Sequence, residues 1–180
     1  LFFYTILISA AFFLFFTTSK ELFFKKFSNI SQAVAHFGFS LFILSILFNG
    51  ILSSEITTNI KVGERYSYND GEIFFEKIEE KNESNFNSII GYFIITNNKG
   101  KTVELNPEIR VYNQPIMITS EADIQTTLLE DKFLVMNIVN GNDYFNIRYQ
   151  VKPFMLWIWV SVLLLSLGGL MSLIKRKYEK

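Results

Sequence analysis

The sequence predicts a membrane α-helical protein with an all-β domain inserted between its second and third transmembrane helices. Three apolar stretches, 1–18, 32–53 and 154–174, are each about long enough to cross a bilayer as a helix. The intervening segment 54–152 consists instead of short runs rich in Ile, Val, Phe and Tyr, separated by turn residues. Hydrophobic residues make up 49% of the chain, which suits a membrane protein with a sizeable polar part.

The composition also argues against several kinds of site. The 180 residues contain no cysteine, which excludes disulfides, thiolate metal sites and cysteine nucleophiles. A single histidine makes a self-contained zinc site or hydrolase triad improbable, so we expect no catalytic residue in this chain. The 17 basic and 17 acidic residues balance, and we expect no nucleic-acid partner.

The first predicted transmembrane helix, Leu1–Thr18, begins inside an apolar run without an initiator methionine. We therefore take the sequence to be a fragment of a longer chain, cut within or just before a membrane span. A cleaved signal peptide fits poorly, because neither a basic amino-terminal region nor a small-residue cleavage site is visible. A short link, Ser19–Ser31, follows.

The second predicted helix, Gln32–Ser53, carries His36, the only histidine of the protein. An imidazole in lipid is costly to leave without a partner, which favours a functional role over one that only bonds a neighbouring helix. Ala33 and Ser40 are small and Phe39 is flat, so this helix face could accept a planar macrocycle while His36 ligates its iron. A proton relay is less favoured, because these spans show no second ionisable group.

The depth of His36 follows from helix geometry. Ser53 lies 17 positions further along, or roughly 26 Å in a helix. Since the hydrocarbon core is about 30 Å thick, His36 is expected in the leaflet opposite the β domain, as a buried site.

The placement of charge predicts the orientation in the membrane. The link 19–31 and the tail 175–180 together hold seven basic and two acidic residues, whereas the long loop holds ten basic and fifteen acidic residues. Short loops enriched in Lys and Arg lie on the cytoplasmic side. The β domain is therefore expected outside the cytoplasm, with the link and the tail inside.

The long loop is expected to form a small barrel or sandwich. Turn signals occur at Asn69–Gly71, Asn97–Gly100 and Asn140–Asp143. Pro107 and Pro115 argue against central strands in the middle of the domain. The predicted strands are Ile73–Ile78, Ser88–Thr96, Thr102–Leu105, Phe133–Val139 and Tyr144–Val151, with a mobile loop over Glu79–Asn87 and a short helix over Glu121–Leu129 capped by Ser120.

Two further motifs have structural interpretations. Trp157 and Trp159, near the start of the third helix, are typical of interfacial anchors rather than of haem binding, and Gly168-Gly169 indicates close helix packing. Glu108, Arg110 and Tyr112 recur with period two, which places them on one face of an extended segment. We interpret this group as structural.

Four blocks of the sequence, in order, resemble the carboxy-terminal part of CcmF-type haem lyases of system I cytochrome c maturation. The Pro-Glu-x-Arg-x-Tyr block and the Lys-Pro-Phe…Trp-Ile-Trp block make the resemblance fairly specific. The blocks are Val34-Ala-His-Phe-Gly-Phe-Ser40; Lys61-Val-Gly-Glu64; Leu105-Asn-Pro-Glu-Ile-Arg-Val-Tyr112 with Thr119-Ser-Glu-Ala-Asp-Ile124 and Asp131; and Val151-Lys-Pro-Phe154 with Trp157-Ile-Trp159 and Gly168-Gly169.

The resemblance implies that the complete protein helps attach haem covalently to apocytochrome c outside the membrane. It implies a multi-pass protein of the bacterial inner membrane, or its mitochondrial equivalent, with the β domain in the periplasm. Its partners would be the haem chaperone CcmE, CcmH-type subunits and apocytochrome c. A transmembrane haem b would be held by His36 as an axial ligand of the iron. The Trp-rich haem-binding loop and the other histidine ligands of this family are absent here, so this chain alone should not catalyse attachment.

Two alternatives remain open. The chain could belong to a paralogue dedicated to one multihaem cytochrome, such as a nitrite reductase. It could also be a membrane-anchored β-domain that only scaffolds partners, with a structural His36.

Overall fold

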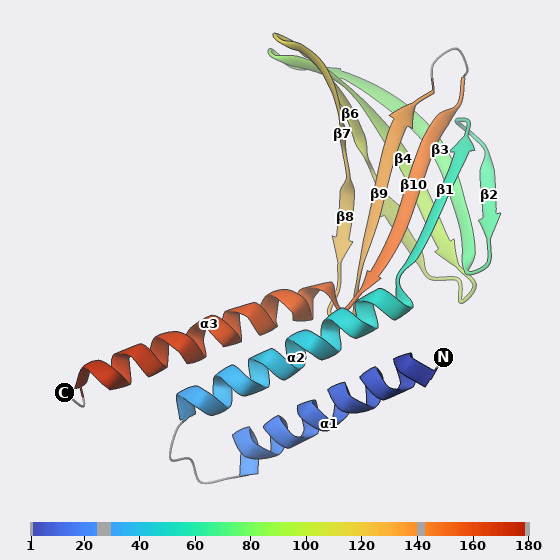
Figure 1. The fold of residues 1–180 in the computed structure, drawn as a ribbon. Helices are drawn as coiled ribbons and strands as arrows, with labels where there is room; N and C mark the ends of the chain where they lie inside the picture. The colour runs from blue at the N-terminus through green and yellow to red at the C-terminus, as the bar shows by residue number, and fades with distance from the viewer. Residues whose placement is uncertain (1, 25–29, 140–142, 179–180) are drawn as a thin grey trace. The chain divides into compact units, whose positions relative to one another are not determined.

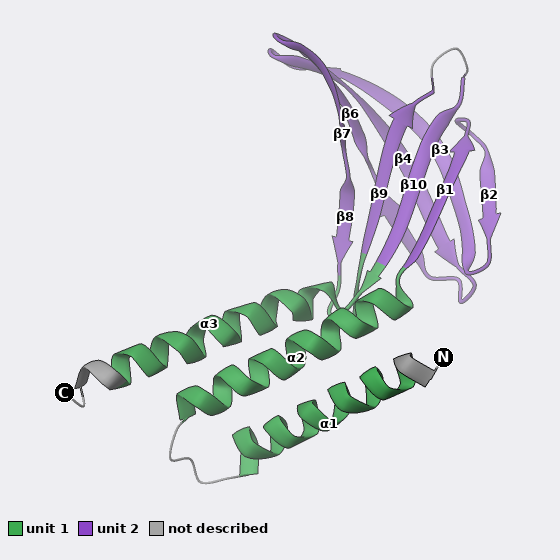
Figure 2. Ribbon diagram, viewed as in Figure 1, with its two compact units in different colours: residues 1–53, 127–131, 152–180 green, residues 54–126, 132–151 purple. Residues whose placement is uncertain are grey.

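The computed structural model describes the chain except residues 1, 25–29, 140–142 and 179–180, and divides it into two compact units. The helical unit comprises residues 1–53, 127–131 and 152–180, and the β unit comprises residues 54–126 and 132–151 (Figure 2). The chain therefore passes between the units four times, rather than only where the helices end.

The helical unit contains three helices, α1 (Phe2–Phe24), α2 (Ile30–Leu52) and α3 (Met155–Tyr178). Each is long and apolar enough to cross a membrane, and α2 lies between α1 and α3 (Figure 1). The first helix continues past Thr18, so the described part of the predicted link at 19–24 is helical. No glycine or proline interrupts α1 there, and the exposed Lys20 can extend its ammonium toward water.

A hydroxyl pair and aromatic contacts join α1 to α2. The hydroxyls of Thr18 and Ser40 lie 2.7 Å apart within hydrogen-bonding distance, and both residues are buried. The ring of Phe37 on α2 packs against Phe15 and Phe23 of α1, with centroids 5.7 and 5.9 Å away. Hydrogen bonds between hydroxyls are a common means of joining helices in lipid, where apolar burial gives little driving force.

Close backbone contact joins α2 to α3. A Cβ atom at Gly168 would lie 2.7 Å from the backbone nitrogen of Ala35, and one at Gly38 would lie 2.9 Å from the nitrogen of Leu165. The predicted packing role is confirmed for Gly168. It is wrong for Gly169, around which the space is open.

The β unit is built from two antiparallel sheets. One has the strand order β1-β10-β9-β8, and the other has the order β2-β3-β4-β6-β7, with β5 also paired to β4 (Figure 1). The strands are β1 (Ser54–Ile60), β2 (Arg65–Tyr68), β3 (Gly71–Asn82), β4 (Phe86–Asn97), β5 (Thr102–Leu105), β6 (Glu108–Asn113), β7 (Ile116–Glu121), β8 (Asp123–Thr126), β9 (Glu130–Ile138) and β10 (Phe145–Pro153).

The core of the β unit lies between the two sheets, which makes it a sandwich and not a barrel. Phe75 of β3 and Phe93 of β4 stack at 4.1 Å, and Phe145 of β10 meets Phe75 edge-on at 5.5 Å. Both sheets supply fully buried side chains, such as Ile109 from β6 and Leu134 from β9. The alternation of these apolar residues with exposed ones is the period-two pattern that predicted the strands.

Several details of the predicted β domain are wrong. The helix expected over Glu121–Leu129 is absent: Ser120 pairs with Ile109 in the β6–β7 ladder, and its hydroxyl donates to Asn137 instead of capping a helix. Pro107 and Pro115 flank β6, a strand between β4 and β7, rather than preventing one.

The expected mobile loop Glu79–Asn87 forms the paired ends of β3 and β4, in register from Asn82 with Asn87. Cross-strand polar partners, such as the Tyr92 hydroxyl donating to Glu79, let this segment form strands despite its polarity. The expected turns at Asn69–Gly71 and Asn97–Gly100 are confirmed, whereas Asn140–Asn142 lies outside the described residues.

Candidate functional site

His36 lies on a face of α2 that neither neighbouring helix covers. Ala35, just before it, is in contact with Gly168 of α3, and Phe37, just after it, is in contact with α1. These two contacts fix the helix on both sides, and the His36 side chain is exposed. No other described residue shares a hydrogen bond with it.

An exposed stripe runs along α2 with His36 as its only titratable group. We call it the His36 face, and its members repeat at intervals of three or four residues, the spacing of one side of a helix. Phe39 is 48% and Ile46 is 43% exposed. The members are the exposed residues Gln32, His36, Phe39, Ile46 and Gly50, together with Ile43, which is half-buried.

The small residues expected beside His36 do not lie on this face. Ala33 is 3% exposed and Ser40 is fully buried, because both face neighbouring helices, and Ser40 bonds to Thr18. A planar group ligated by His36 would therefore lie over Phe39 and Ile43 instead. Phe39 is exposed on the same face as His36, and its role beside a ligand remains a prediction. The remaining members of the His36 face follow His36 at helical intervals of three or four residues. The sequence alone could not identify them, because it does not show which face of α2 the other helices leave open.

His36 lies close to the amino-terminal end of α2, and the leaflet in which it lies remains a prediction. Six residues, about 9 Å, separate His36 from the start of α2 at Ile30. Its neighbour Phe37 contacts Phe23, which lies beyond Lys20 and Glu21 on α1. His36 is thus close to the level at which α1 carries its charged residues.

The described residues include no group of three or more His, Cys, Asp and Glu side chains that could hold a metal ion. His36 would therefore act on a metal as a single ligand from this part of the chain. The exposed imidazole and the apolar Phe39 and Ile43 fit a haem, which presents its iron to an imidazole and its macrocycle to apolar side chains.

Trp157 has a local role at the start of α3. Its indole nitrogen donates to the carbonyl of Leu128 at 2.8 Å, and Trp159 is 62% exposed. An indole N–H that serves a turn of the same unit fits the predicted interfacial anchor.

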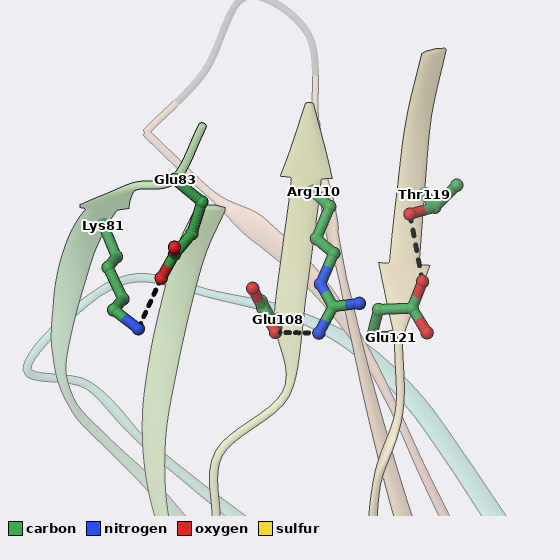
Figure 3. A network of polar contacts seen from close by, with 6 residues as sticks. All are labelled: Lys81, Glu83, Glu108, Arg110, Thr119 and Glu121. Atoms are coloured by element: carbon green, nitrogen blue, oxygen red, sulfur yellow. Dashed lines mark hydrogen bonds and ion pairs between the residues drawn. The ribbon is translucent and has the colours of Figure 1, made fainter. Parts of the chain in front are cut away.

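The predicted group of Glu108, Arg110 and Tyr112 lies on one face of β6 (Figure 3 shows the first two with their polar neighbours). The Arg110 guanidinium donates to the Glu108 carboxylate at 2.8 Å and lies 5.0 Å from the ring of Phe86, which packs against Tyr112. The hydrogen bond from Arg110 lowers the pKa of Glu108 and raises the pKa of Arg110.

Neighbouring strands continue this polar surface. Thr119 of β7, opposite Arg110 in the ladder, donates to Glu121 at 3.1 Å, and Lys81 pairs with Glu83 at 2.6 Å on the β3–β4 hairpin (Figure 3). Glu83, Glu108 and Glu121 each accept a hydrogen bond or ion pair from a nearby side chain, so these polar groups stabilise the surface of the sheet. The structural interpretation of Arg110 remains a prediction.

The model of a protein family described as the CcmF C-terminal beta-sandwich matches residues 51–153, more than half of the chain. The chain belongs to the CcmF family. This confirms the resemblance seen in the four sequence blocks and the sandwich architecture of the β unit.

Individual relatives agree with this membership. Cytochrome c-type biogenesis protein CcmF of Pseudomonas fluorescens is 28% identical over 146 residues, which is 81% of this chain and 22% of that protein. The probable cytochrome c-type biogenesis protein NrfE of Escherichia coli (strain K12) is 27% identical over 139 residues, 77% of this chain and 25% of that protein. The chain thus spans about a quarter of the length of the curated relatives it matches.

Among solved structures, the cytochrome c heme lyase CcmF superimposes with a TM-score of 0.63 at 18% identity, covering 87% of this chain and 27% of that one. At this identity the likeness shows the fold. Three helices able to span a membrane, together with CcmF relatives, make the chain part of a membrane protein.

Proposed function

We propose that the chain acts in system I cytochrome c maturation, with His36 as an axial ligand of a b-type haem inside the membrane. The observation that carries this proposal is the exposed imidazole of His36, without a described hydrogen-bond partner, on an apolar helix of a CcmF-family protein. A structural histidine would be expected to bond a neighbouring helix, and both neighbouring helices instead contact Ala35 and Phe37.

The residues around His36 would orient the ligand and keep water away from it. The contacts of Ala35 with α3 and Phe37 with α1 hold the backbone on either side of the imidazole. Phe39 and Ile43 offer apolar surface on the same face. When bound, haem would supply one-electron chemistry. This part of the chain offers one histidine, so a second axial ligand would come from outside residues 1–180.

Attachment of haem to apocytochrome c, with CcmE and CcmH-type subunits as partners, is proposed for the complete protein and not for this chain alone. The chain spans only about a quarter of its relatives, and it has the single histidine and no cysteine. The chain is nearly as similar to NrfE, at 27% identity, as to CcmF, at 28%, so a paralogue serving one multihaem cytochrome stays a second candidate.

The charge distribution supports an orientation with the β unit in the periplasm of a bacterial inner membrane, or the mitochondrial equivalent. Reporter fusions at Asn97 and after Lys180 of the complete protein should report opposite sides of the membrane. A cytoplasmic signal from the Asn97 fusion would reject this orientation.

The test of the haem assignment is His36→Ala in the complete protein, purified from membranes. We expect the b-type absorption bands to be lost or sharply weakened relative to protein, and cytochrome c maturation to fall with them. Added imidazole should restore part of the spectrum, because it can enter the space left by the side chain. Gln32→Ala, on the same face one turn away, is the matched control and should keep its haem.

The structural and scaffold alternatives predict a different result. His36→Ala would then lower the amount of protein while leaving the haem-to-protein ratio and the spectrum unchanged. That outcome would remove His36 as the ligand.

A further inference from the structure

The turn between β8 and β9 is held by the start of α3. Trp157 donates its indole N–H to the carbonyl of Leu128, and the backbone N–H of Phe154 donates to the carbonyl of Leu129, both at 2.8 Å. Accordingly, residues 127–131 belong to the helical unit, although β8 and most of β9 belong to the β unit. Two adjacent carbonyls of one turn are thus bonded by donors at the start of a membrane helix.

The turn is also closed on itself. The backbone N–H and the hydroxyl of Thr127 both donate to the carbonyl of Glu130, at 3.0 and 2.8 Å, and the N–H of Glu130 donates to the Thr127 hydroxyl at 3.1 Å. The two residues between them, Leu128 and Leu129, point outward and are 70% and 65% exposed. These bonds fix the backbone of the turn, and its two leucine side chains are left on the surface.

Contacts within the helical unit place this turn at one end of the helices. Asn49, near the end of α2, donates to the carbonyl of Pro153 at 2.7 Å, and Phe48 packs on Phe154 with centroids 5.1 Å apart. α2 therefore ends beside the start of α3, where the turn is bonded. Ends of apolar helices that carry tryptophan lie at the boundary between lipid hydrocarbon and water.

We propose that Leu128 and Leu129 form a lipid-contacting anchor, inserted into the phospholipid interface of the leaflet in which α2 ends and α3 begins. Continuity with the lipid-facing surface favours phospholipid as the occupant: the exposed apolar residues of α3 begin at Trp159, two residues after the Trp157 that bonds the turn. Removing two exposed leucine side chains from water is favourable, so their burial favours the lipid interface over solvent.

The anchor would give the β unit a further attachment along the chain, besides its covalent junctions with α2 and α3. The chain leaves the β unit at Thr126 and returns to it at Lys132, so the turn is flanked on both sides by strands of the sandwich. This inference rests on the helices crossing a membrane and is independent of any haem at His36.

Depth-dependent fluorescence quenching tests the anchor in the complete polypeptide, with any cysteines elsewhere replaced by serine. Leu128→Cys is labelled with an environment-sensitive dye and reconstituted into phosphatidylcholine–phosphatidylglycerol nanodiscs. Two controls use residues that are also exposed: Leu163→Cys, 64% exposed in the middle of α3, and Ile116→Cys, 87% exposed on β7.

We expect the dye at Leu128 to be quenched severalfold more strongly by a nitroxide near the lipid headgroup than by one deep in the acyl chain. The dye at Leu163 should show the reverse order, and the dye at Ile116 should be quenched by neither lipid. Water-like emission at Leu128, matching Ile116, would reject the anchor. Protection of Leu128 from both lipid nitroxides and aqueous iodide would show that protein covers it, which also rejects lipid as the occupant.

A second variant tests the bond that holds the turn. Trp157→Phe keeps an aromatic ring but removes the indole donor, and should reduce the headgroup quenching at Leu128. Trp159→Phe should leave the quenching unchanged, because the Trp159 indole makes no such bond to a described residue. Equal quenching in all three backgrounds would show that Trp157 does not position the turn.

Discussion

Replacing Gly168 with alanine should separate α2 from α3 beside the candidate ligand. The added Cβ would lie 2.7 Å from the backbone nitrogen and 2.8 Å from the Cβ of Ala35. Ordinary contacts between such atoms are about 3.5–4.0 Å, so the helices must move apart by about 1 Å. The obstructing atoms include backbone of α2, which cannot rotate away as a flexible side chain could.

The expected cost follows from these distances. Overpacking a close interface typically costs about 1–3 kcal/mol, whereas alanine gains up to about 1 kcal/mol over glycine in a helix interior. Three atoms of Ala35 lie within 2.7–2.9 Å of the added Cβ, which puts the overpacking cost in the upper part of its range, about 2–3 kcal/mol. After the gain from alanine, the net loss of stability for Gly168→Ala is about 1–2 kcal/mol. Gly169→Ala is the matched control: the space around it is open, so the alanine should be neutral or slightly stabilising.

The assay is unfolding of the purified complete protein in mixed micelles, titrated with a denaturing detergent and followed by far-ultraviolet circular dichroism. Gly168→Ala should unfold at lower denaturant than Gly169→Ala. If His36 ligates haem, Gly168→Ala should also weaken the b-type spectrum, because Ala35 precedes His36 directly. Equal unfolding of the two variants would show that the close contact at Ala35 does not exist as described.

Two predictions concern the polar surface of β6. Arg110→Ala should lower stability modestly, because the Glu108 carboxylate loses its donor and Phe86 loses its cation. It should reduce the amount of assembled protein more than the activity per assembled protein; normal accumulation without activity would instead identify a binding site. The pKa of Glu108 is lowered in the folded protein, so its stabilising effect is complete above the ordinary value of 4.5 and is lost as pH falls through the lowered value. The difference in unfolding free energy between the natural protein and Glu108→Gln, about 1 kcal/mol at pH 7, should therefore shrink below pH 4.5, and a difference that stayed constant down to pH 3 would contradict the ion pair.

The apolar runs predicted the three helices because their length is set by the bilayer and not by tertiary detail. The strands around Ile73 and Ile95 were found from period-two alternation, which reflects a sandwich with one face of each sheet buried. The strand β6 was missed because proline was weighed as a breaker, whereas Pro107 and Pro115 lie just outside it. The helix predicted after Ser120 does not form, because Ser120 pairs with Ile109 across β6 and β7 and this pairing outweighs the local capping signal.

The candidate site could likewise be predicted from the sequence only in part. His36 could be singled out from the sequence, because an ionisable residue in an apolar run is rare. The sequence could not show which neighbouring residues share its face, because Ala33 and Ser40 are as close to His36 along the helix as Phe39. Tertiary contacts decide the question: Ser40 bonds to Thr18 of α1, and Ala35 packs against Gly168 of α3.

The contacts of α2 with α1 and α3 determine the side from which a ligand could reach His36. With α1 on one side and α3 on the other, the His36 face is exposed at most positions from Gln32 to Gly50 and half-buried at Ile43. Apolar side chains such as Phe39 and Ile46 need no protein cover in lipid, but an imidazole does need a partner. Since the described residues provide none, a partner for His36 would approach from the open face. A haem ligated from this face, as proposed above, would meet that requirement.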